Sequence, residues 1–198
     1  MIGALCDADL FARFLEGENA AYTVLYHRYS ARILGYIQSL LGADNQAADD
    51  IFQETFIRLF RERTKERSAE DAPLRNVGGW LFRVARNLSL NQLRSESYLA
   101  DLPEDHNDKL TTSVSDAYPL FFGEKLEEEA MLRRVYAIVE GLPVALREVF
   151  MLREVNGMSY EETAAIIGCT MEAARMRLSR ARGIIRRTLV PDLDKIRN

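Results

Sequence analysis

The sequence predicts an all-α protein with two small helical domains, an N-terminal helical bundle and a C-terminal helix-turn-helix domain, joined by a flexible acidic linker. Apolar residues recur at helical spacing over most of the 198 residues, and no stretch alternates as a half-buried strand would. Between about Tyr98 and Gly123 this periodicity stops, because two prolines and many Asp, Asn, Ser and Thr residues disfavour a long helix. Signals for two short consecutive helices follow in Met158–Leu189. We therefore expect domains at 1–97 and 126–190, with the linker at 98–125.

Four helices are expected in the first domain. They are predicted at about Asp7–Leu15, Glu18–Leu41, Asn45–Arg63 and Val77–Ser95. Gly17 and Gly42 end the first two, since glycine readily takes the left-handed conformation that follows a helix. Asp44 is suited to cap the third helix, and a charged loop at 64–75 separates it from the fourth.

The third helix divides into a core stripe and a polar face. The stripe is expected at i, i+4, i+7 and i+8, which are Phe52, Phe56, Leu59 and Phe60. The polar face combines carboxylates, an amide, an arginine and one isoleucine: Asp49, Asp50, Gln53, Glu54, Ile57 and Arg58. We discount a metal site, because no histidine accompanies the carboxylates, which are favourable near a helix N-terminus in any case. A mixed polar face with one exposed isoleucine fits a contact with another protein better.

The fourth helix shows the same division. Its core residues are expected to be Leu81, Val84 and Leu88, with Trp80 beside them in preference to stacking on a base. The outer face mixes cations and amides at i, i+4, i+8 and i+11, which are Arg83, Asn87, Asn91 and Arg94. Because cations bind phosphates and amides hydrogen-bond base edges, this face suits single-stranded or locally opened DNA.

The second domain is expected to begin with two helices before the helix-turn-helix motif. They are predicted at about Glu124–Glu140 and Pro143–Val155. Proline is common in the first turn of a helix, which fits Pro143, and Gly157 supplies a C-terminal stop.

The helix-turn-helix motif carries its own boundary signals. Ser159 and Glu162 fit a capping box at the start of the first helix, Gly168 ends that helix, and Thr170 can cap the second. Each helix presents a narrow apolar face at i, i+4 and i+7, formed by Tyr160, Ala164 and Ile167 and by Ala174, Leu178 and Ala181.

The second helix of the motif is rich in arginine and is expected to bind DNA. In such motifs this helix lies in the major groove with its N-terminal residues near base edges, which nominates Thr170, Met171, Glu172, Arg175 and Met176. Four further side chains are better placed for phosphates, namely Arg177, Ser179, Arg180 and Arg182. The alternative is a solvated arginine face on an ordinary amphipathic helix. The caps, the turn and the spacing together favour DNA.

Charge is unevenly distributed along the chain. The formal net charge is -4 at pH 7, which by itself argues against a nucleic-acid binder. Residues 171–188, however, hold six arginines and one acidic residue, whereas residues 96–130 hold ten acidic residues and two lysines. The excess of acidic residues therefore lies in the middle of the chain and away from the expected DNA face.

Several functional classes are disfavoured by what the chain contains. Cys6 and Cys169 lie far apart and outside any Cys/His cluster, so we expect reduced thiols, no metal site and no cofactor. His27 and His106 have no Ser or Cys partner suited to nucleophilic catalysis, and we expect a protein that is not an enzyme. No apolar run is long enough to span a membrane and the N-terminus lacks a signal-peptide pattern, so we expect a cytoplasmic protein without membrane insertion.

Three segments, taken in order, resemble a known family. They are ADDIFQETFIRLFRE (48–62), NVGGWLFRVARNLSLNQLR (76–94) and LPVALREVFMLREVNGMSYEETAAIIGCTMEAARMRLSRARGIIRRTL (142–189). Together they resemble the sigma-70-type factors of the extracytoplasmic-function (ECF) group over most of the chain. Helix-turn-helix motifs alone are common, whereas these segments in this order and spacing are specific.

The resemblance implies an alternative sigma factor, which binds core RNA polymerase, directs it to promoters and helps to melt the DNA. The polar face of the third helix would meet the polymerase. The face of the fourth helix, together with Asn76 and Arg86, would engage the −10 element and capture a flipped base. The helix-turn-helix would read the −35 element. An anti-sigma factor is a further partner that the resemblance implies.

Two other interpretations use the same residues. A stand-alone helix-turn-helix regulator would bind operators as a dimer without contacting polymerase. An enzyme acting on nucleic acid would use Asp49, Asp50 and Glu54. Promoter-dependent transcription on adding the chain to core polymerase distinguishes both from a sigma factor.

Overall fold

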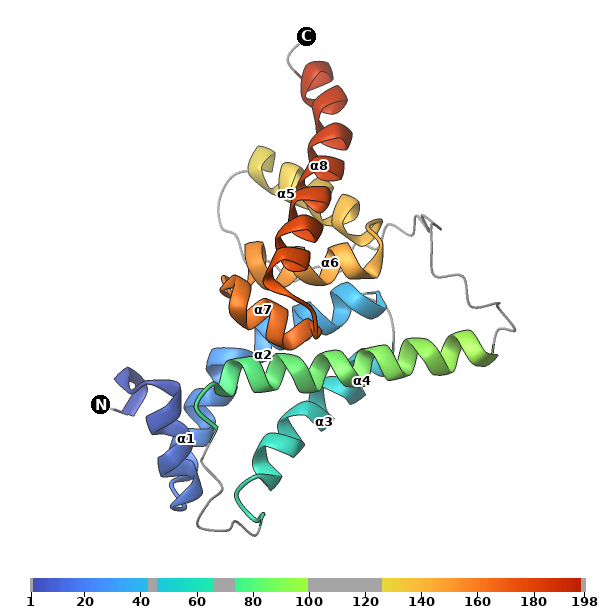
Figure 1. Cartoon of the computed structure of the whole chain (residues 1–198). Helices are drawn as coiled ribbons and strands as arrows, with labels where there is room; N and C mark the ends of the chain where they lie inside the picture. The colour runs from blue at the N-terminus through green and yellow to red at the C-terminus, as the bar shows by residue number, and fades with distance from the viewer. Residues whose placement is uncertain (1, 43–45, 66–73, 100–125, 197–198) are drawn as a thin grey trace.

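The computed structural model describes residues 2–42, 46–65, 74–99 and 126–196. All regular structure within these ranges is helical, which confirms the all-α prediction. Figure 1 shows the helices in two stacked groups, an N-terminal bundle made of the elements before residue 100 and a C-terminal domain made of those after residue 125. Of the linker expected at 98–125, residues 100–125 lie outside the described residues, whereas residues 98 and 99 are helical.

The N-terminal bundle is built around one long central helix. Its elements are η1 (Ile2–Ala4), α1 (Asp7–Leu15), α2 (Asn19–Leu41), α3 (Ala47–Arg61) and α4 (Val77–Leu99). Helix α2 contacts α1, α3 and α4, because apolar side chains recur along its length and are buried from Leu25 through Ile33 to Ile37. Gly42 ends α2 as predicted, with a φ of 98° that favours glycine, although its ψ of 147° is not that of the left-handed helical conformation.

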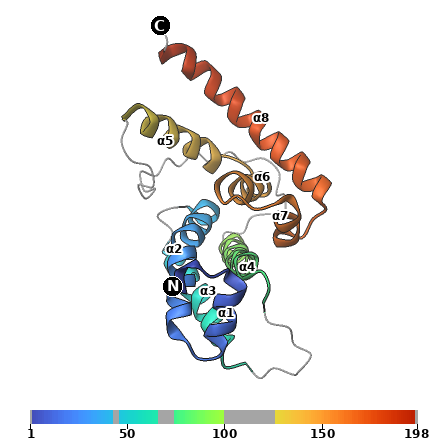
Figure 2. The ribbon, with the colours of Figure 1, turned by 90° about the vertical axis from the view of Figure 1, so that its left-hand side faces the viewer.

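The C-terminal domain packs three helices against a long last one. Its elements are α5 (Leu126–Glu140), α6 (Val144–Phe150), η2 (Met151–Val155), α7 (Tyr160–Ile167) and α8 (Met171–Ile196). Helix α8 contacts α5, α6 and α7, and its C-terminal end extends away from the bundle (Figure 2). Pro143 is the N-cap of α6 with a ψ of 139°, so the expectation that it belongs to the first helical turn is wrong by one position.

Element η2 is a π-helical turn that continues α6. The backbone N–H of Asn156 donates to the carbonyl of Met151 over 3.0 Å, a ring one residue wider than that of an α-helix. Gly157 follows with a φ of 67°, which reverses the chain into the helix-turn-helix motif. The sequence predicted a continuous helix to Val155 and gave no sign of the wider turn.

The bounds of α3 and α4 differ from the sequence prediction. Helix α3 begins at Ala47 with Gln46 as N-cap, two residues after the expected start, and the expected cap Asp44 lies outside the described residues. Helix α4 runs to Leu99, four residues past the expected end at Ser95. No proline or glycine lies between these two positions, so nothing local stops the helix.

The core register of α3 and α4 also differs from the prediction. In α3, Phe60 is 45% exposed and lies at the rim of the core, where its ring centroid is 5.3 Å from that of Tyr22 and 5.6 Å from that of Phe14. In α4, Phe82 is fully buried while Val84 and Leu88 are only half-buried. The buried stripe of α4 runs through Leu81, Phe82, Ala85 and Ser89, so Val84 and Leu88 lie at its edge.

The start of α4 lies close against α2. A Cβ atom at Gly78 would stand 2.6 Å from the Tyr29 hydroxyl oxygen, a distance that a side chain cannot occupy. Asn76 caps the helix, since its Oδ1 accepts from the backbone N–H of Gly79 over 2.7 Å. Glycine here therefore permits a close approach of two helices and does not break α4.

Candidate nucleic-acid and protein interfaces

The helix-turn-helix motif folds as its local signals predict. The N–H of Glu162 donates to Ser159 Oγ over 3.0 Å, and the N–H of Ser159 donates to Glu162 Oε2 over 2.8 Å, which completes the capping box. This backbone hydrogen bond from Ser159 is the main reason that the pKa of Glu162 is lowered. Gly168 ends α7 in the left-handed conformation, and Thr170 Oγ1 accepts from the N–H of Ala173 over 3.1 Å.

Loss of the capping box is expected to weaken the motif measurably. Replacing Ser159 with alanine removes one acceptor for the free N–H groups of α7 and is expected to lower the free energy of unfolding by about 1 kcal/mol. Urea denaturation followed by circular dichroism measures the change. Ser95→Ala is the control, because that exposed hydroxyl bonds within its own helix and should change stability by less than about 0.5 kcal/mol. Equal effects of the two changes would show that the cap does not stabilise α7.

Helix α8 buries one face and exposes the predicted DNA face. Ala174, Leu178 and Ala181 are fully buried, so the apolar stripe predicted from the sequence is confirmed. The exposed residues include nearly all of those nominated for DNA: Thr170, Met171, Glu172, Arg175, Met176, Ser179, Arg180 and Arg182, with Arg177 partly buried. The two methionines are 41% and 59% exposed, which leaves two large apolar side chains in solvent beside the arginines.

Two arginines of α8 are held by neighbouring side chains. The Arg175 guanidinium lies over the Tyr160 ring at 5.2 Å from its centroid, and Arg153 lies at 4.2 Å from the same centroid. Arg182 donates to Glu154 Oε1 over 2.6 Å. These contacts orient the arginine face against α7 and η2. Sequence reasoning assigned Tyr160 only to the apolar face and missed its contact with Arg175.

The outer face of α4 keeps most of its predicted ladder in solvent. Arg83, Asn87, Asn91 and Arg94 are all exposed, as their spacing on a helix predicts. Arg86 differs, because it is directed toward the C-terminal domain and pairs with Glu148 of α6 over 2.7 Å. The six residues predicted for opened DNA therefore do not form one continuous exposed set.

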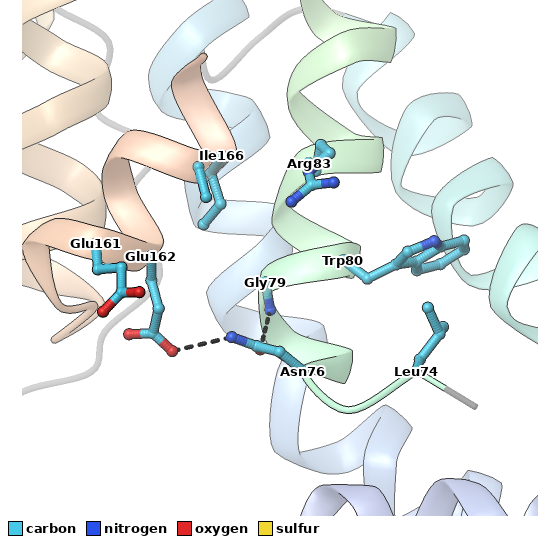
Figure 3. Close-up of a pocket in the computed structure, with 9 residues that line it drawn as sticks. Leu74, Asn76, Gly79, Trp80, Arg83, Glu161, Glu162 and Ile166 are labelled. Atoms are coloured by element: carbon cyan, nitrogen blue, oxygen red, sulfur yellow. Dashed lines mark hydrogen bonds between the residues drawn. The ribbon is translucent and has the colours of Figure 1, made fainter. Parts of the chain in front are cut away.

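Asn76 lies where α4 meets α7. Its Nδ2 donates to Glu162 Oε1 over 3.0 Å, as Figure 3 shows. Beside this contact is an open cavity of about 330 Å³ between α4 and α7. It is lined by Leu74, Asn76, Gly79, Trp80 and Arg83 and, across from them, by Glu161, Glu162, Ala165 and Ile166. Trp80 is thus half-buried at the edge of the core and also faces this cavity.

The outer face of α3 combines charge with exposed apolar surface. Asp49, Asp50 and Gln53 are exposed, and Ile57 is 42% exposed. Phe60 follows Ile57 by three positions and is exposed too, so the two form an apolar pair on the surface. The sequence analysis assigned Ile57 to the exposed face of the helix but Phe60 to the core. The i, i+3 spacing between Phe60 and Ile57 was the signal that could have indicated the exposure of Phe60.

Glu54 is held by two arginines on the same helix. Arg58 Nε donates to its Oε1 over 2.8 Å, and Arg61 lies at 3.8 Å. The hydrogen bond from Arg58 lowers the pKa of Glu54, so this carboxylate stays ionised on the surface.

Among the residues that the structure describes, no group of three or more His, Cys, Asp or Glu side chains is placed to hold a metal ion. Nor does any described helix have the length and apolar character needed to cross a membrane.

Comparison with known proteins relates both parts of the chain to one family. The model for Sigma-70 region 2 matches residues 25–98, and the model for Sigma-70, region 4 matches residues 132–184. The RNA polymerase sigma-H factor of Pseudomonas aeruginosa is 32% identical, covering 93% of this chain and 94% of the relative. The ECF RNA polymerase sigma-E factor of Escherichia coli is 30% identical, covering 94% of this chain and 96% of the relative.

Solved structures share the same fold. CnrH, in complex with the cytosolic domain of CnrY, has a TM-score of 0.64 at 24% identity, covering 94% of this chain and 98% of that chain. The sigma factor RpoE of Bartonella quintana, in complex with the anti-sigma factor NepR, has a TM-score of 0.62 at 22% identity, covering 85% and 96%. Given the relatives at 30% identity or more over nearly the whole chain, this protein belongs to the ECF group of sigma-70 family RNA polymerase sigma factors.

Proposed function

We propose that this sigma factor binds core RNA polymerase through the outer face of α3, engages the opened −10 element with the outer face of α4, and reads the −35 element with the N-terminal half of α8. Residues 1–97 would form the region 2 domain, 98–125 the linker and 126–190 the region 4 domain. The chain would act as a non-enzymatic initiation factor in the cytoplasm.

The observation that carries this proposal is the separation of two surfaces suited to DNA. Exposed Arg83, Asn87 and Asn91 lie on α4 of the N-terminal bundle, whereas exposed Arg175 and Arg180 lie on α8 of the C-terminal domain. A cation and amide ladder suits unpaired bases, and an arginine-bearing second helix of a helix-turn-helix suits duplex. A factor that binds a promoter at two elements needs both surfaces, whereas a simple operator-binding regulator needs only the one on α8.

The polymerase contact is supported by the chemistry of α3. The exposed pair Ile57 and Phe60 gives an apolar centre, and exposed Asp49, Asp50 and Gln53 extend the face with polar groups toward the N-terminal end of α3. Apolar anchors inside a polar rim are the usual anatomy of a protein interface. We extend the proposal to an anti-sigma factor, because the Bartonella quintana sigma factor that shares this fold was solved with one.

Run-off transcription tests the proposal as a whole. Core polymerase, purified chain and templates with candidate promoters should give transcripts that require both the chain and the promoter. Core polymerase alone on the same templates is the control. Tight binding of the chain to duplex operators, with no promoter-dependent transcript on any template, would instead support the regulator.

Phosphate contact by α8 has a measurable salt signature. Arg180 is exposed on the arginine face, and its replacement with alanine should weaken promoter binding by the complex with polymerase on every sequence. The slope of log K against log salt concentration should become shallower by about 0.9, the value for one phosphate contact on duplex DNA. Arg13→Ala is the control, because Arg13 is also exposed but lies on α1. An unchanged slope in the Arg180 variant would remove this residue from the phosphate contacts.

A further inference from the structure

Met176 is an apolar side chain in the middle of a polar surface. It is 59% exposed, the largest exposed fraction among the large apolar side chains that the structure describes. On α8 its neighbours at i−4, i+3 and i+4 are Glu172, Ser179 and Arg180, and all three are exposed. Because the side chains at these positions are charged or polar, Met176 is a single apolar group and not part of a wider apolar patch.

The position of Met176 on α8 is almost opposite the buried stripe of the helix. Each residue turns an α-helix by about 100°, so Met176 lies about 200° around the axis from Ala174, which is fully buried. Met176 also lies in the N-terminal part of α8, which begins at Met171, and this part approaches base edges in helix-turn-helix motifs. Its direction and its place along the helix both put Met176 where α8 would face the floor of the major groove.

Two arginines of α8 are held toward α7 and η2 and away from Met176. The Arg175 guanidinium lies over the ring of Tyr160 on α7, 5.2 Å from its centroid, and Arg182 donates to Glu154 of η2 over 2.6 Å. Both arginines lie roughly a quarter of a turn around the axis from the buried stripe, on one flank of α8. The outermost part of this face is therefore left to Met176.

The major groove offers one kind of apolar group among polar ones. Its base edges carry hydrogen-bond donors and acceptors, and the apolar exception is the C5-methyl group of thymine. A methionine side chain has no donor and only a weak acceptor in its sulfur, so it gains little from the polar edges. It can take the thymine methyl group out of water, and its flexible, unbranched chain adapts to where that group lies. A single exposed methionine thus suits a single methyl group.

We propose that Met176 is a specificity-determining residue, which contacts the C5-methyl group of one thymine in the promoter duplex that α8 reads. The proposal rests on the function proposed above for α8 and adds the base that this residue selects. At that base pair the chain distinguishes thymine from cytosine by an apolar contact. Uracil lacks the methyl group and 5-methylcytosine carries it, so these two bases should change the affinity in opposite directions.

Selection of binding sites identifies the base pair that Met176 contacts. The probe is a pool of duplexes with a random segment, incubated with the complex of the full-length chain and core polymerase. The wild-type complex should select thymine at one position where the Met176→Ala complex accepts the four bases nearly equally, with the other selected positions unchanged. Val155→Ala is the control, because Val155 is 44% exposed in the same domain but lies on η2, and it should select as the wild type does.

Removing one methyl group from the selected duplex tests the contact itself. Replacing that thymine with uracil should weaken binding by the wild-type complex about fourfold, the effect of one methyl group taken out of water. In a second duplex cytosine replaces the thymine, and methylation of its C5 should strengthen binding by a similar factor. The Met176→Ala complex should bind both members of each pair equally, because no side chain is left to contact the methyl group. Fluorescence anisotropy of labelled duplexes measures the affinities.

Two further variants separate the apolar contact from a folding defect. Met176→Leu keeps an apolar side chain and should keep the effect of the methyl group. Met176→Gln has nearly the same length but ends in a polar amide, and it should lose the effect. Leucine, glutamine and alanine form helices about as well as methionine, and the side chain is mostly exposed, so all three variants should fold like the wild type.

The results distinguish this proposal from the function on which it rests. Selection of a base other than thymine at the position that depends on Met176, or an equal effect of uracil on the wild type and Met176→Ala, overturns the thymine contact and leaves the reading of duplex by α8 intact. A wild-type complex that selects no sequence from the pool overturns both. A methyl effect that is present in the wild type and Met176→Leu, and lost in Met176→Ala and Met176→Gln, establishes the contact.

Discussion

Replacing Phe82 with alanine is expected to lower the free energy of unfolding by about 3–5 kcal/mol, the cost of removing a fully buried phenyl ring and leaving a cavity. The ring packs edge-on against Tyr36 of α2, with centroids 5.3 Å apart, and the Arg32 guanidinium lies 5.7 Å from the Phe82 centroid. Phe82 therefore joins α4 to α2 in the core of the bundle. Urea denaturation of the full chain, followed by far-ultraviolet circular dichroism, measures the loss.

Val84→Ala is the matched control for this change, because it tests which side of α4 faces the core. The apolar spacing of the sequence places Val84 inward, whereas the structure leaves it half-buried. We expect Val84→Ala to cost about 1 kcal/mol, since a side chain that is only partly removed from water contributes less. If Val84→Ala cost as much as Phe82→Ala, the register described here for α4 would be incorrect.

Introducing a charge at Ile57 is expected to disrupt binding to core polymerase while the fold persists. Ile57→Asp places a carboxylate at the centre of the exposed apolar pair on α3 and should weaken the complex about tenfold to a hundredfold, in the range of a central interface residue. Because Ile57 is 42% exposed, thermal unfolding of the free chain should change little. Titration of labelled core polymerase with the variant measures the affinity.

Ala20→Asp serves as the control for added charge. Ala20 is exposed in the first turn of α2, where a negative charge is favourable to the helix, and it lies on the same bundle as Ile57. Its affinity for polymerase should equal that of the wild type. Wild-type affinity in Ile57→Asp would place the polymerase contact on another face of the bundle.

Features that depend on a few neighbouring residues could be predicted from the sequence. The capping box of Ser159 and Glu162, the left-handed Gly168 and the stripe of Ala174, Leu178 and Ala181 are all local, because caps and helical faces are set within one or two turns. The all-α fold and the two helical groups follow from the same kind of signal. For this reason the sequence also predicts most of the exposed residues of α4 and α8.

Features that depend on packing could not be predicted in this way. Arg86 and Glu148 are 62 positions apart, and nothing near either residue indicates that they pair. The burial of Phe82 and the exposure of Phe60 depend on which helices lie against α4 and α3, which a single helical stripe does not encode. The contact between Arg86 and Glu148 is accordingly a property of the tertiary structure alone.

The π-turn at Met151–Val155 bears on how the chain that leads into the helix-turn-helix tolerates a change in length. Each residue of an α-helix advances the chain by about 100° around its axis, so deleting a residue from an ordinary helical turn rotates everything downstream by about that angle. A π-turn fits about one more residue into a turn than an α-turn does. Removing one residue at Met151–Val155 would therefore allow an ordinary α-helical turn and leave the arginines of α8 pointing in nearly the same direction. The same deletion within Val144–Phe150 would turn them away.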